Sequence, residues 1–275
     1  MAGILWLASY PKSGNTWLRI FLANLFADAR KAFDINALGR HVYGEMSADL
    51  YERVAGRLVA GMTDEELHRL RPKVHRLLAG LRPETVFVKT HNAIAVQDGV
   101  ATVTPEVTAG AIYIVRNPLD VVVSYADHYG LTLDQAVEAI ASPENRVVTS
   151  EKAVFQHLGD WSGHVRSWTE APGLAPHVVR YEDLLDDPQA GFAGVVRFLG
   201  LDAPRPRLRR AIRFAGFDEV KRQERRRGFT EKSRNSSAFF RQGQAGQWRE
   251  ALTPKQIDAV TRAHSAAMER YGYLP

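Results

Sequence analysis

The sequence predicts a doubly wound α/β fold, in which helices flank a mainly parallel central sheet. Two observations carry this prediction. Short apolar runs of strand length alternate with longer segments of helical spacing, and a phosphate-binding type of loop follows the first run. With 275 residues, 45% of them hydrophobic, the chain can bury one large core. No linker interrupts the pattern, so we expect a single domain over residues 1–275.

The chain opens with a strand, a loop and a helix. Gly3 to Ser9 is an apolar run bounded by turn residues, which is typical of a buried strand in a parallel sheet. Tyr10 to Gly14 is the turn. From Asn15 onward, apolar side chains recur at helical spacing, at Trp17, Leu18, Phe21, Leu22, Leu25 and Phe26. This order places the loop at the N-terminus of a helix.

The later elements continue the alternation. Further strands are expected at Thr85 to Lys89, Ala111 to Val115 and His177 to Tyr181. Helices are expected from Thr63 to about Leu78, from Asn117-Pro118 to Tyr129, from Thr149 to Glu170, from Pro188 to Leu199 and from Thr253 to Tyr271. Capping boxes at Thr63 and Thr253 define two of these starts.

Composition narrows the class of protein. A charged fraction of 24% is that of a soluble globular protein and not of a disordered chain. Without cysteine the chain has no disulfide, thiolate metal site or cysteine nucleophile, so we expect a cytoplasmic location. The apolar runs Ile4 to Ala8 and Leu18 to Phe26 are shorter than the roughly 18 to 20 residues of a membrane span, so no membrane anchor is expected.

Positive charge is concentrated in one segment. The formal net charge is +5, but Arg205 to Arg234 contain 12 Lys and Arg against four Asp and Glu. Such a segment attracts the phosphates of a nucleotide, of nucleic acid or of an anionic surface. It is also what a solvated helical face looks like, and we favour solvent for the charges that two phosphates cannot use.

The loop from Tyr10 to Trp17, with the sequence YPKSGNTW, lies between the predicted strand and helix. Backbone amides there converge at a helix N-terminus, which binds phosphate through free N–H groups and the helix dipole, and Lys12 adds a full charge. The Walker pattern G-x-x-x-x-G-K-[ST] is absent, because the lysine precedes the glycine. Taken alone, the loop could be an ordinary turn.

Polar residues also follow the next two predicted strands. Lys89 and His91 alternate at the end of one strand, so both face the same side of the carboxyl edge, where open parallel sheets bind ligands. His91 has a suitable pKa for a general base, although a histidine at a strand end is more often structural. Arg116 and Ser124 could grip one phosphate, or Arg116 could pair with Asp120 at the start of the helix.

The segment Phe239 to Trp248 is a glycine-interrupted loop with an aromatic flank on each side. Its glycines permit close approach of the backbone to an anion, and Arg241 supplies charge. The alternative is a plain flexible loop before the last helix.

In this order, these segments resemble the cytosolic-type sulfotransferases, which move a sulfuryl group from 3′-phosphoadenosine 5′-phosphosulfate (PAPS) to an acceptor. YPKSGNTW resembles their 5′-phosphosulfate loop YPKSGTTW, and KTH (89–91) resembles their lysine and catalytic histidine. IVRNPLDVVVSY (114–125) resembles their 3′-phosphate segment, and FRQGQAGQW (240–248) their RKGxxGDW lid. YEDL (181–184) and FDEVK (217–221) also match, so the resemblance spans residues 4 to 248.

The resemblance implies a role for each matching residue. Lys12 would neutralise the bridging oxygen, His91 would take the acceptor's proton, and Lys89 would stabilise the transferring sulfuryl oxygens. The 5′-phosphosulfate would be bound by Lys12, Ser13, Gly14, Asn15, Thr16 and the amide of Trp17. The 3′-phosphate would be bound by Arg116, Ser124, Arg241 and Gly243, with Gln242 at the position of the lid lysine. The adenine would pack against Trp17, Tyr181 and Phe217. PAPS would be the donor and 3′,5′-diphosphoadenosine (PAP) the product, without a metal.

This chain departs from the family pattern in ways that bear on donor affinity and on the acceptor. The departures are Asn15 in place of Thr, Gln242 in place of Lys, Gln247 in place of the acid before Trp248, Ala215 in place of Thr, and Asn92-Ala93 in place of Leu-Pro after KTH.

Three classes of function are therefore weighed. The favoured one is a PAPS-dependent sulfotransferase acting on a hydroxyl or amine of a small molecule, sugar or lipid, with no nucleic-acid partner. A P-loop kinase or NTPase would need a GK[ST] loop and a Mg²⁺-binding Asp where Arg116 stands. A non-catalytic nucleotide or nucleic-acid binding module would use the basic segment and bind with steep salt dependence.

Overall fold

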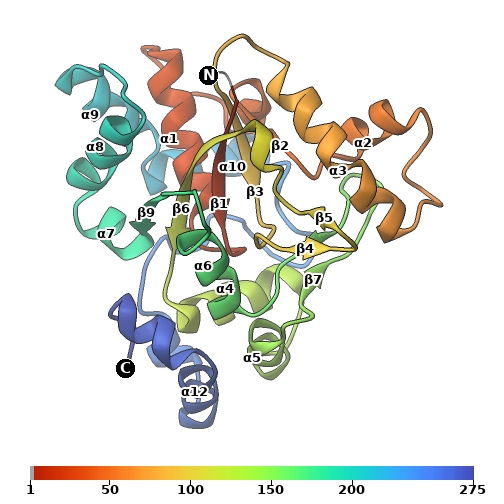
Figure 1. Ribbon diagram of the computed structural model, residues 1–275. Helices are drawn as coiled ribbons and strands as arrows, with labels where there is room; N and C mark the ends of the chain where they lie inside the picture. Colours follow the sequence, from red (N-terminus) through yellow and green to blue (C-terminus); the bar gives the residue numbers. More distant parts are fainter. Residues whose placement is uncertain (1–2) are drawn as a thin grey trace. The chain divides into compact units, whose positions relative to one another are not determined.

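The computed structural model describes residues 3–275, which form two compact units (Figure 1). Unit 1 consists of the residues up to Tyr10 together with Val42–Tyr113 and Ala139–Val178. Unit 2 consists of Pro11–His41, Ile114–Glu138 and Val179–Pro275. Because the chain passes between the units several times, neither is a continuous stretch of sequence. A single domain over 1–275 stays a prediction.

The main sheet has five strands in the order β2-β3-β1-β6-β9. The strands are β1 Ile4–Ser9, β2 Val42–Gly44, β3 Val86–Thr90, β6 Thr108–Val115 and β9 His177–Arg180. β1 pairs in parallel with β3, and β2 pairs in parallel with β3. From β1 the strand order runs outward in both directions, which is the doubly wound arrangement, so the predicted α/β fold is confirmed. The three-residue β2 was not predicted.

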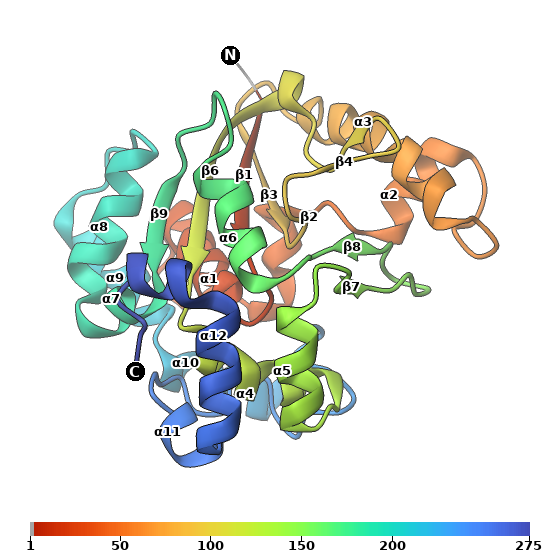
Figure 2. The same cartoon turned by 60° about the horizontal axis from the view of Figure 1, so that its bottom comes forward.

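The helices and the short strands outside the main sheet are labelled in Figures 1 and 2. The helices are α1 Asn15–Ala27, α2 Ala48–Ala55, α3 Asp64–Ala79, α4 Pro118–Tyr129, α5 Leu133–Ala141, α6 Trp161–Thr169, α7 Tyr181–Asp186, α8 Pro188–Phe198, α9 Arg205–Phe214, α10 Phe217–Arg227, α11 Trp248–Ala251 and α12 Pro254–Arg270. Two 3-10 turns (η1 Ile35–Arg40, η2 Pro105–Val107) and two short antiparallel pairs (β4 Val96–Gln97 with β5 Val100–Ala101, β7 Arg146–Val147 with β8 Gln156–His157) complete the fold.

Helix starts follow the capping signals of the sequence. Both predicted capping boxes form, at Thr63 before α3 and at Thr253 before α12. Pro118 occupies the first turn of α4, and the side chain of Asn117 accepts a hydrogen bond from the Leu119 amide. Local chemistry is therefore sufficient to place these three helix starts.

The prediction of a helix from Thr149 to Glu170 is wrong. The helix in this region, α6, begins only at Trp161. Gly159 has a left-handed φ of +64°, and the side chain of Asp160 caps the helix by accepting a hydrogen bond from the Gly163 amide at 2.8 Å. Tyr181 likewise ends no strand, because β9 stops at Arg180 and Tyr181 starts α7.

The core of unit 1 forms where helices α3 and α6 meet the sheet. Trp6 of β1 is fully buried, packs edge-on against His75 of α3 with ring centroids 4.9 Å apart, and donates a hydrogen bond to Thr108. Tyr113 of β6 stacks on Trp168 of α6. These contacts pack β1 against α3 and β6 against α6. Over residues 3–275, every helix is too short or too polar to cross a bilayer.

Candidate active site

The loop before α1, in unit 2, has the backbone geometry of an anion cradle. Lys12 and Gly14 both adopt left-handed conformations, with φ of +69° and +105°. A Cβ on Gly14 would lie 2.7 Å from the Tyr181 ring, so this position needs glycine both for its backbone and for space. Gly14 is the N-cap of α1, which leaves the first amides of the helix available to a phosphate.

A buried hydroxyl at the same loop also fits a phosphate. Ser13 is fully buried, and its Oγ has no hydrogen-bond partner within residues 3–275. A buried hydroxyl left unpaired costs about 1–3 kcal/mol, which an oxygen of a bound phosphate would remove. The next residues, Asn15 and Thr16, form the first turn of α1. The loop therefore fits the group that the sequence resemblance implies.

The ammonium of Lys12 lies among groups of unit 2. Its Nζ is 3.4 Å from Nδ1 of His128 in α4 and 4.4 Å from the centroid of the Phe239 ring. His128 was not singled out from the sequence, because nothing in its pattern distinguishes it from any histidine on a helix.

Arg116, directly after β6, links the phosphate loop to the loop before α11. Its Nη1 donates to the carbonyl of Lys12 at 3.0 Å, and its Nη2 donates to the carbonyl of Gln244 at 3.1 Å. The guanidinium also lies over the Tyr181 ring, 4.4 Å from the centroid. Ser124, the residue expected to share a phosphate with Arg116, is half-buried in the next helix, α4.

The segment 239–248 is anchored at both ends by buried carboxylates. Glu224 of α10 accepts hydrogen bonds from the amides of Phe239 and Phe240, at 2.7 and 3.0 Å. Asp120 of α4 accepts from the amides of Gly246 and Trp248, at 2.7 and 3.2 Å. The sequence had offered Asp120 as an ion-pair partner of Arg116, but its carboxylate binds this loop. We call residues 239–248 the anchored loop.

Within the anchored loop, the residues expected at a 3′-phosphate differ in their surroundings. Gly243 has φ of +63°, and a Cβ there would collide with the Phe217 ring. Arg241 forms an ion pair with Asp127 at 3.3 Å, and its carbonyl accepts from Lys221. Gln242 is exposed. Of these three residues, Arg241 is the one whose charge is paired with a side chain of unit 2.

The aromatic residues expected around an adenine lie at helix starts. Trp17 is in the first turn of α1, with its ring 5.8 Å from that of Tyr181, the first residue of α7. Phe217 is the first residue of α10 and carries the Lys221 ammonium 5.0 Å from its ring centroid. Unit 2 thus brings Gly14, Trp17 and Tyr181 together at one point and Gly243 and Phe217 at another.

Unit 1 contains the residues expected to act on the acceptor. His91 directly follows β3, and its Nδ1 lies 2.7 Å from the carbonyl oxygen of Ser9. Because a carbonyl only accepts, Nδ1 carries the proton, and Nε2 is the basic nitrogen of the neutral ring. Lys89 is the fourth residue of β3, and its Nζ lies 3.9 Å from the sulfur of Met46.

The main chain of His91 is held by a neutral histidine. His164 of α6 donates from Nε2 to the carbonyl of His91 at 3.0 Å and accepts at Nδ1 from the hydroxyl of Tyr113 at 2.9 Å. Burial lowers the pKa of His164 to about 4, so the ring stays neutral at pH 7 and keeps one donor and one acceptor. No group of three or more His, Asp or Glu side chains in the described part of the chain could hold a metal ion.

Comparison with known proteins places the whole chain in one family. A sequence model described as the sulfotransferase domain matches residues 4–272. The chain therefore belongs to the sulfotransferase family, and the fold and enzyme class predicted from its motifs are confirmed. The two alternative classes weighed from the sequence, a P-loop kinase or NTPase and a non-catalytic binding module, are therefore not the class of this protein.

Individual relatives are distant but cover most of the chain. Sulfotransferase 1A1 from Canis lupus familiaris is 24% identical over 278 residues, covering 98% of this chain and 84% of the relative. Sulfotransferase 1A1 from Bos taurus is 27% identical, covering 95% and 82%. The crystal structure of the mouse sulfotransferase SULT7A1 complexed with PAP superposes with a TM-score of 0.62 at 21% identity, covering 100% of this chain and 90% of that one. A retinol dehydratase solved with androsterone and PAP gives 0.63 at 20% identity, covering 96% and 80%. The two structures share the fold.

Proposed function

We propose that this protein transfers a sulfuryl group from PAPS to a hydroxyl or amine of a small-molecule, sugar or lipid acceptor, and that it does so in the cytoplasm. The observation that carries the donor assignment is the phosphate loop of unit 2, where left-handed Lys12 and Gly14, the unpaired hydroxyl of Ser13 and the start of α1 form one cradle. The structural relatives solved with PAP support the same donor.

In this proposal the residues of unit 2 hold the nucleotide. PAPS, when bound, supplies a sulfuryl group on a phosphosulfate anhydride. The amides of residues 13–16 and the Ser13 hydroxyl bind the 5′ end, and Lys12 neutralises charge on the oxygen that is left behind. The Trp17 amide, which the resemblance also implied, instead donates to the carbonyl of Gly14 at 2.9 Å. Arg116 has five N–H donors and gives one each to Lys12 and Gln244, so it retains donors for the 3′-phosphate. Ser124, Arg241, Gln242 and Gly243 complete the 3′ end; Trp17, Tyr181 and Phe217 pack on the adenine.

His91 acts on the acceptor. Its Nδ1–H is fixed on the Ser9 carbonyl, so Nε2 accepts the proton of the acceptor hydroxyl as the new bond forms. Lys89 contributes positive charge to the transferring oxygens. A sulfuryl group carries less charge than a phosphoryl group, so positioning and fixed cations suffice for its transfer. We propose no metal in this reaction.

The donor assignment is tested by titrating the protein with PAP, in parallel with ADP and with ATP plus Mg²⁺, while following thermal unfolding. A ligand that binds only the folded state stabilises it by about 2.7 kcal/mol at a hundred times its Kd. We expect PAP to stabilise the protein without a metal. Stabilisation by ATP with Mg²⁺ alone, or by none of the three, contradicts the proposal.

The Arg116→Ala variant locates the 3′-phosphate. It should bind PAP and 5′-AMP almost equally, because the interaction that distinguishes them is lost. Arg262→Ala is the matched control, since Arg262 is an exposed arginine of unit 2 that pairs only locally with Asp258. Comparing two ligands on one variant removes any effect of the substitution on folding. An unchanged preference for PAP in Arg116→Ala places the 3′-phosphate elsewhere.

A further inference from the structure

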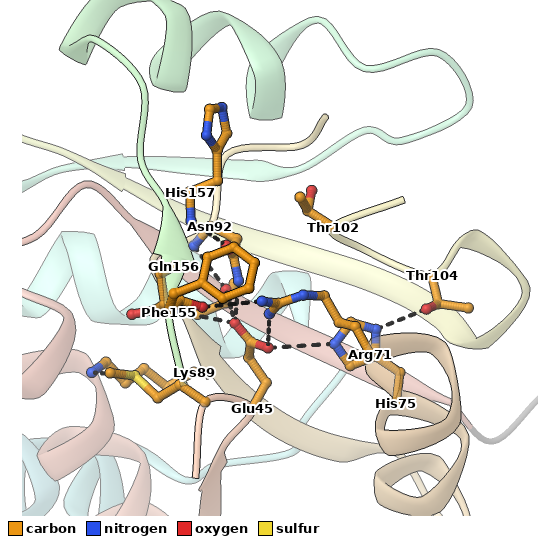
Figure 3. Close-up of polar contacts among 12 residues, drawn as sticks. Glu45, Arg71, His75, Lys89, Asn92, Thr102, Thr104, Phe155, Gln156 and His157 are labelled. Carbon is orange, nitrogen blue, oxygen red and sulfur yellow. Dashed lines mark hydrogen bonds and ion pairs between the residues drawn. The ribbon is translucent and has the colours of Figure 1, made fainter. Parts of the chain in front are cut away.

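A buried carboxylate occupies the centre of a polar cluster in unit 1 (Figure 3). Glu45, the residue after β2, has no exposed surface. Its Oε2 accepts from Nη1 of Arg71 at 2.7 Å and lies 3.5 Å from Nε2 of His75; both residues come from α3. Its Oε1 accepts from the side chains of Thr90, Asn92 and Gln156. We call these six residues the Glu45 cluster.

The charge state of Glu45 follows from these contacts. Burial raises the pKa of a carboxyl group, but the charge of Arg71, the nearby His75 ring and the hydrogen bond from Thr90 outweigh burial and lower the pKa of Glu45 to about 2. Glu45 is therefore ionised at neutral pH. Replacing a buried ion pair by apolar side chains often leaves the stability of a protein unchanged or raises it. A contribution to stability alone therefore does not explain why Glu45 and Arg71 form a buried ion pair here.

Two members of the cluster flank His91 in the sequence. The Thr90 hydroxyl donates to Glu45 at 3.0 Å and accepts from the Asn92 amide at 3.0 Å. The Asn92 side chain donates to Glu45 from Nδ2 and accepts at Oδ1 from the amide of His157. The Asn92 carbonyl accepts from Trp168. Both neighbours of His91 are thus fixed in place.

The opposite side of Glu45 is tied to the rest of unit 1. Its amide donates to the carbonyl of Lys89 at 3.3 Å, which aligns the end of β2 with β3. Arg71 donates a second hydrogen bond to the carbonyl of Phe155. The carboxylate therefore joins α3, β2, β3 and the segment before α6 at the point where His91 leaves the sheet.

We propose that Glu45 is a positioning residue for His91, acting through Thr90 and Asn92. By fixing residues 90–92, Glu45 keeps Nδ1–H of His91 on the Ser9 carbonyl and leaves Nε2 as the basic nitrogen. The inference rests on the proposed role of His91. It also explains why Asn92 follows KTH in this chain: an amide donates to a buried carboxylate, and the leucine of the family pattern does not.

The test reads the state of the His91 ring directly. Protein labelled with ¹⁵N in histidine reports by NMR which ring nitrogen carries the proton, and His91→Gln assigns the signal. In the unaltered protein we expect Nδ1–H for His91. In Glu45→Gln the amide group offers only one acceptor oxygen and presents N–H groups to Arg71. We expect mixed Nδ1–H and Nε2–H forms there, with PAP affinity within twofold of the unaltered protein.

Activity supplies a second measurement. Sulfuryl transfer from ³⁵S-labelled PAPS to a panel of simple phenols and alcohols should show kcat falling by about 10²-fold in Glu45→Gln, the order expected for a misplaced catalytic group, with an unchanged KM for PAPS. Leu78→Ala, which creates a cavity at a fully buried position of α3 outside the cluster, is the control for general destabilisation. It should retain its kcat at temperatures where it is folded.

Thr90 offers a matched pair of milder variants. Thr90→Val keeps the shape but loses the hydroxyl, whereas Thr90→Ser keeps it. We expect Thr90→Val to reproduce the altered His91 signal and the lower kcat, and Thr90→Ser to restore both. This pair tests the inference even if Glu45→Gln does not fold.

The outcomes separate the two proposals. An unchanged His91 signal in folded Glu45→Gln and Thr90→Val overturns the positioning role. An altered signal with unchanged kcat leaves Glu45 as a positioning residue and removes His91 from catalysis. Failure of the unaltered protein to bind PAP overturns the proposed function, while the NMR comparison still tests the link between Glu45 and His91.

Discussion

The imidazole of His91 is defined by two main-chain hydrogen bonds. Its Nδ1 donates to Ser9, and its own carbonyl accepts from His164, so both ring and backbone have a fixed direction. Ser9 is also the last residue of β1, next to the phosphate loop in sequence. The ring therefore depends on the same strand end from which the phosphate loop begins.

Replacing His91 tests its role most simply. His91→Ala should lower kcat by about 10²- to 10⁴-fold, the usual contribution of a general base, and should leave the Kd of PAP unchanged. The control is His157→Gln, which alters another half-buried histidine of unit 1. A near-normal rate in His91→Ala would exclude His91 as the base.

At the level of residues, the sequence could predict those whose chemistry is local. Lys12, Gly14 and Arg116 stand at strand ends and turns that the sequence pattern itself identifies. Glu45 was not found this way, and Asp120 was assigned the wrong partner, because their partners lie far along the chain. These are Arg71 and Asn92 for Glu45, and Gly246 and Trp248 for Asp120. A carboxylate becomes significant only when folding removes it from water.

Among the elements, the anchored loop shows how a segment without regular structure is held. Its first residues bind Glu224 of α10, and its last residues bind Asp120 of α4. Arg116 holds the middle through Gln244. The loop is therefore attached to unit 2 near its start, at its middle and at its end.

The Asp120→Asn variant tests the importance of this anchoring. The amides of Gly246 and Trp248 bind different oxygens of the Asp120 carboxylate, and in asparagine one of these positions becomes an NH2 group that cannot accept, so one amide loses its partner. A hydrogen bond to a charged group contributes about 1.5–3 kcal/mol, so PAP affinity should fall by roughly tenfold or more. Isothermal titration calorimetry gives this value directly. Asp258→Asn, an exposed change on α12, should bind PAP normally, and an unaffected Asp120→Asn would show that the loop is not part of the nucleotide site.

Two regions of the chain were harder to predict than the helices with capping signals. The run from Thr149 to Glu170 has helical spacing, yet Gly159 and Asp160 break it, and the glycine-aspartate pair was the local signal for a later start. The basic segment folds mainly as α9 and α10. Arg225 and Arg226 lie exposed in the last turn of α10, where positive charge is favoured by the helix dipole.

Across the molecule, buried histidines make stability depend on pH. Burial lowers the pKa of His164 to about 4, and it also lowers the pKa of His68, His75 and His157. Such groups bind protons more readily when the chain is unfolded. Their contribution to the free energy of unfolding is complete above pH 6.5, the pKa of histidine in the unfolded chain. It is lost as the pH falls toward the lower pKa of the folded protein.

We therefore expect the Tm to be level above about pH 7 and to decrease from pH 6.5 to pH 4. His164 alone accounts for about 3 kcal/mol over this interval, at 1.36 kcal/mol per pKa unit. Glu45 has a lowered pKa, so its contribution is present above 4.5 and is lost between 4.5 and about 2. Thermal unfolding across pH 8 to 4 measures the decrease. His164→Gln, which cannot titrate, should show a smaller slope, and an identical slope would contradict the assignment.

The five tryptophans are distributed over both units, which bears on the intrinsic fluorescence of the protein. Trp6, Trp161 and Trp168 are fully buried in unit 1, whereas Trp17 and Trp248 belong to unit 2. Trp17 lies in the first turn of α1, and Trp248 is fixed to Asp120 at the end of the anchored loop. If the donor stacks on Trp17 as proposed, we expect it to quench this emitter while the unit 1 tryptophans give a constant background, so that intrinsic fluorescence would report donor occupancy without an attached dye.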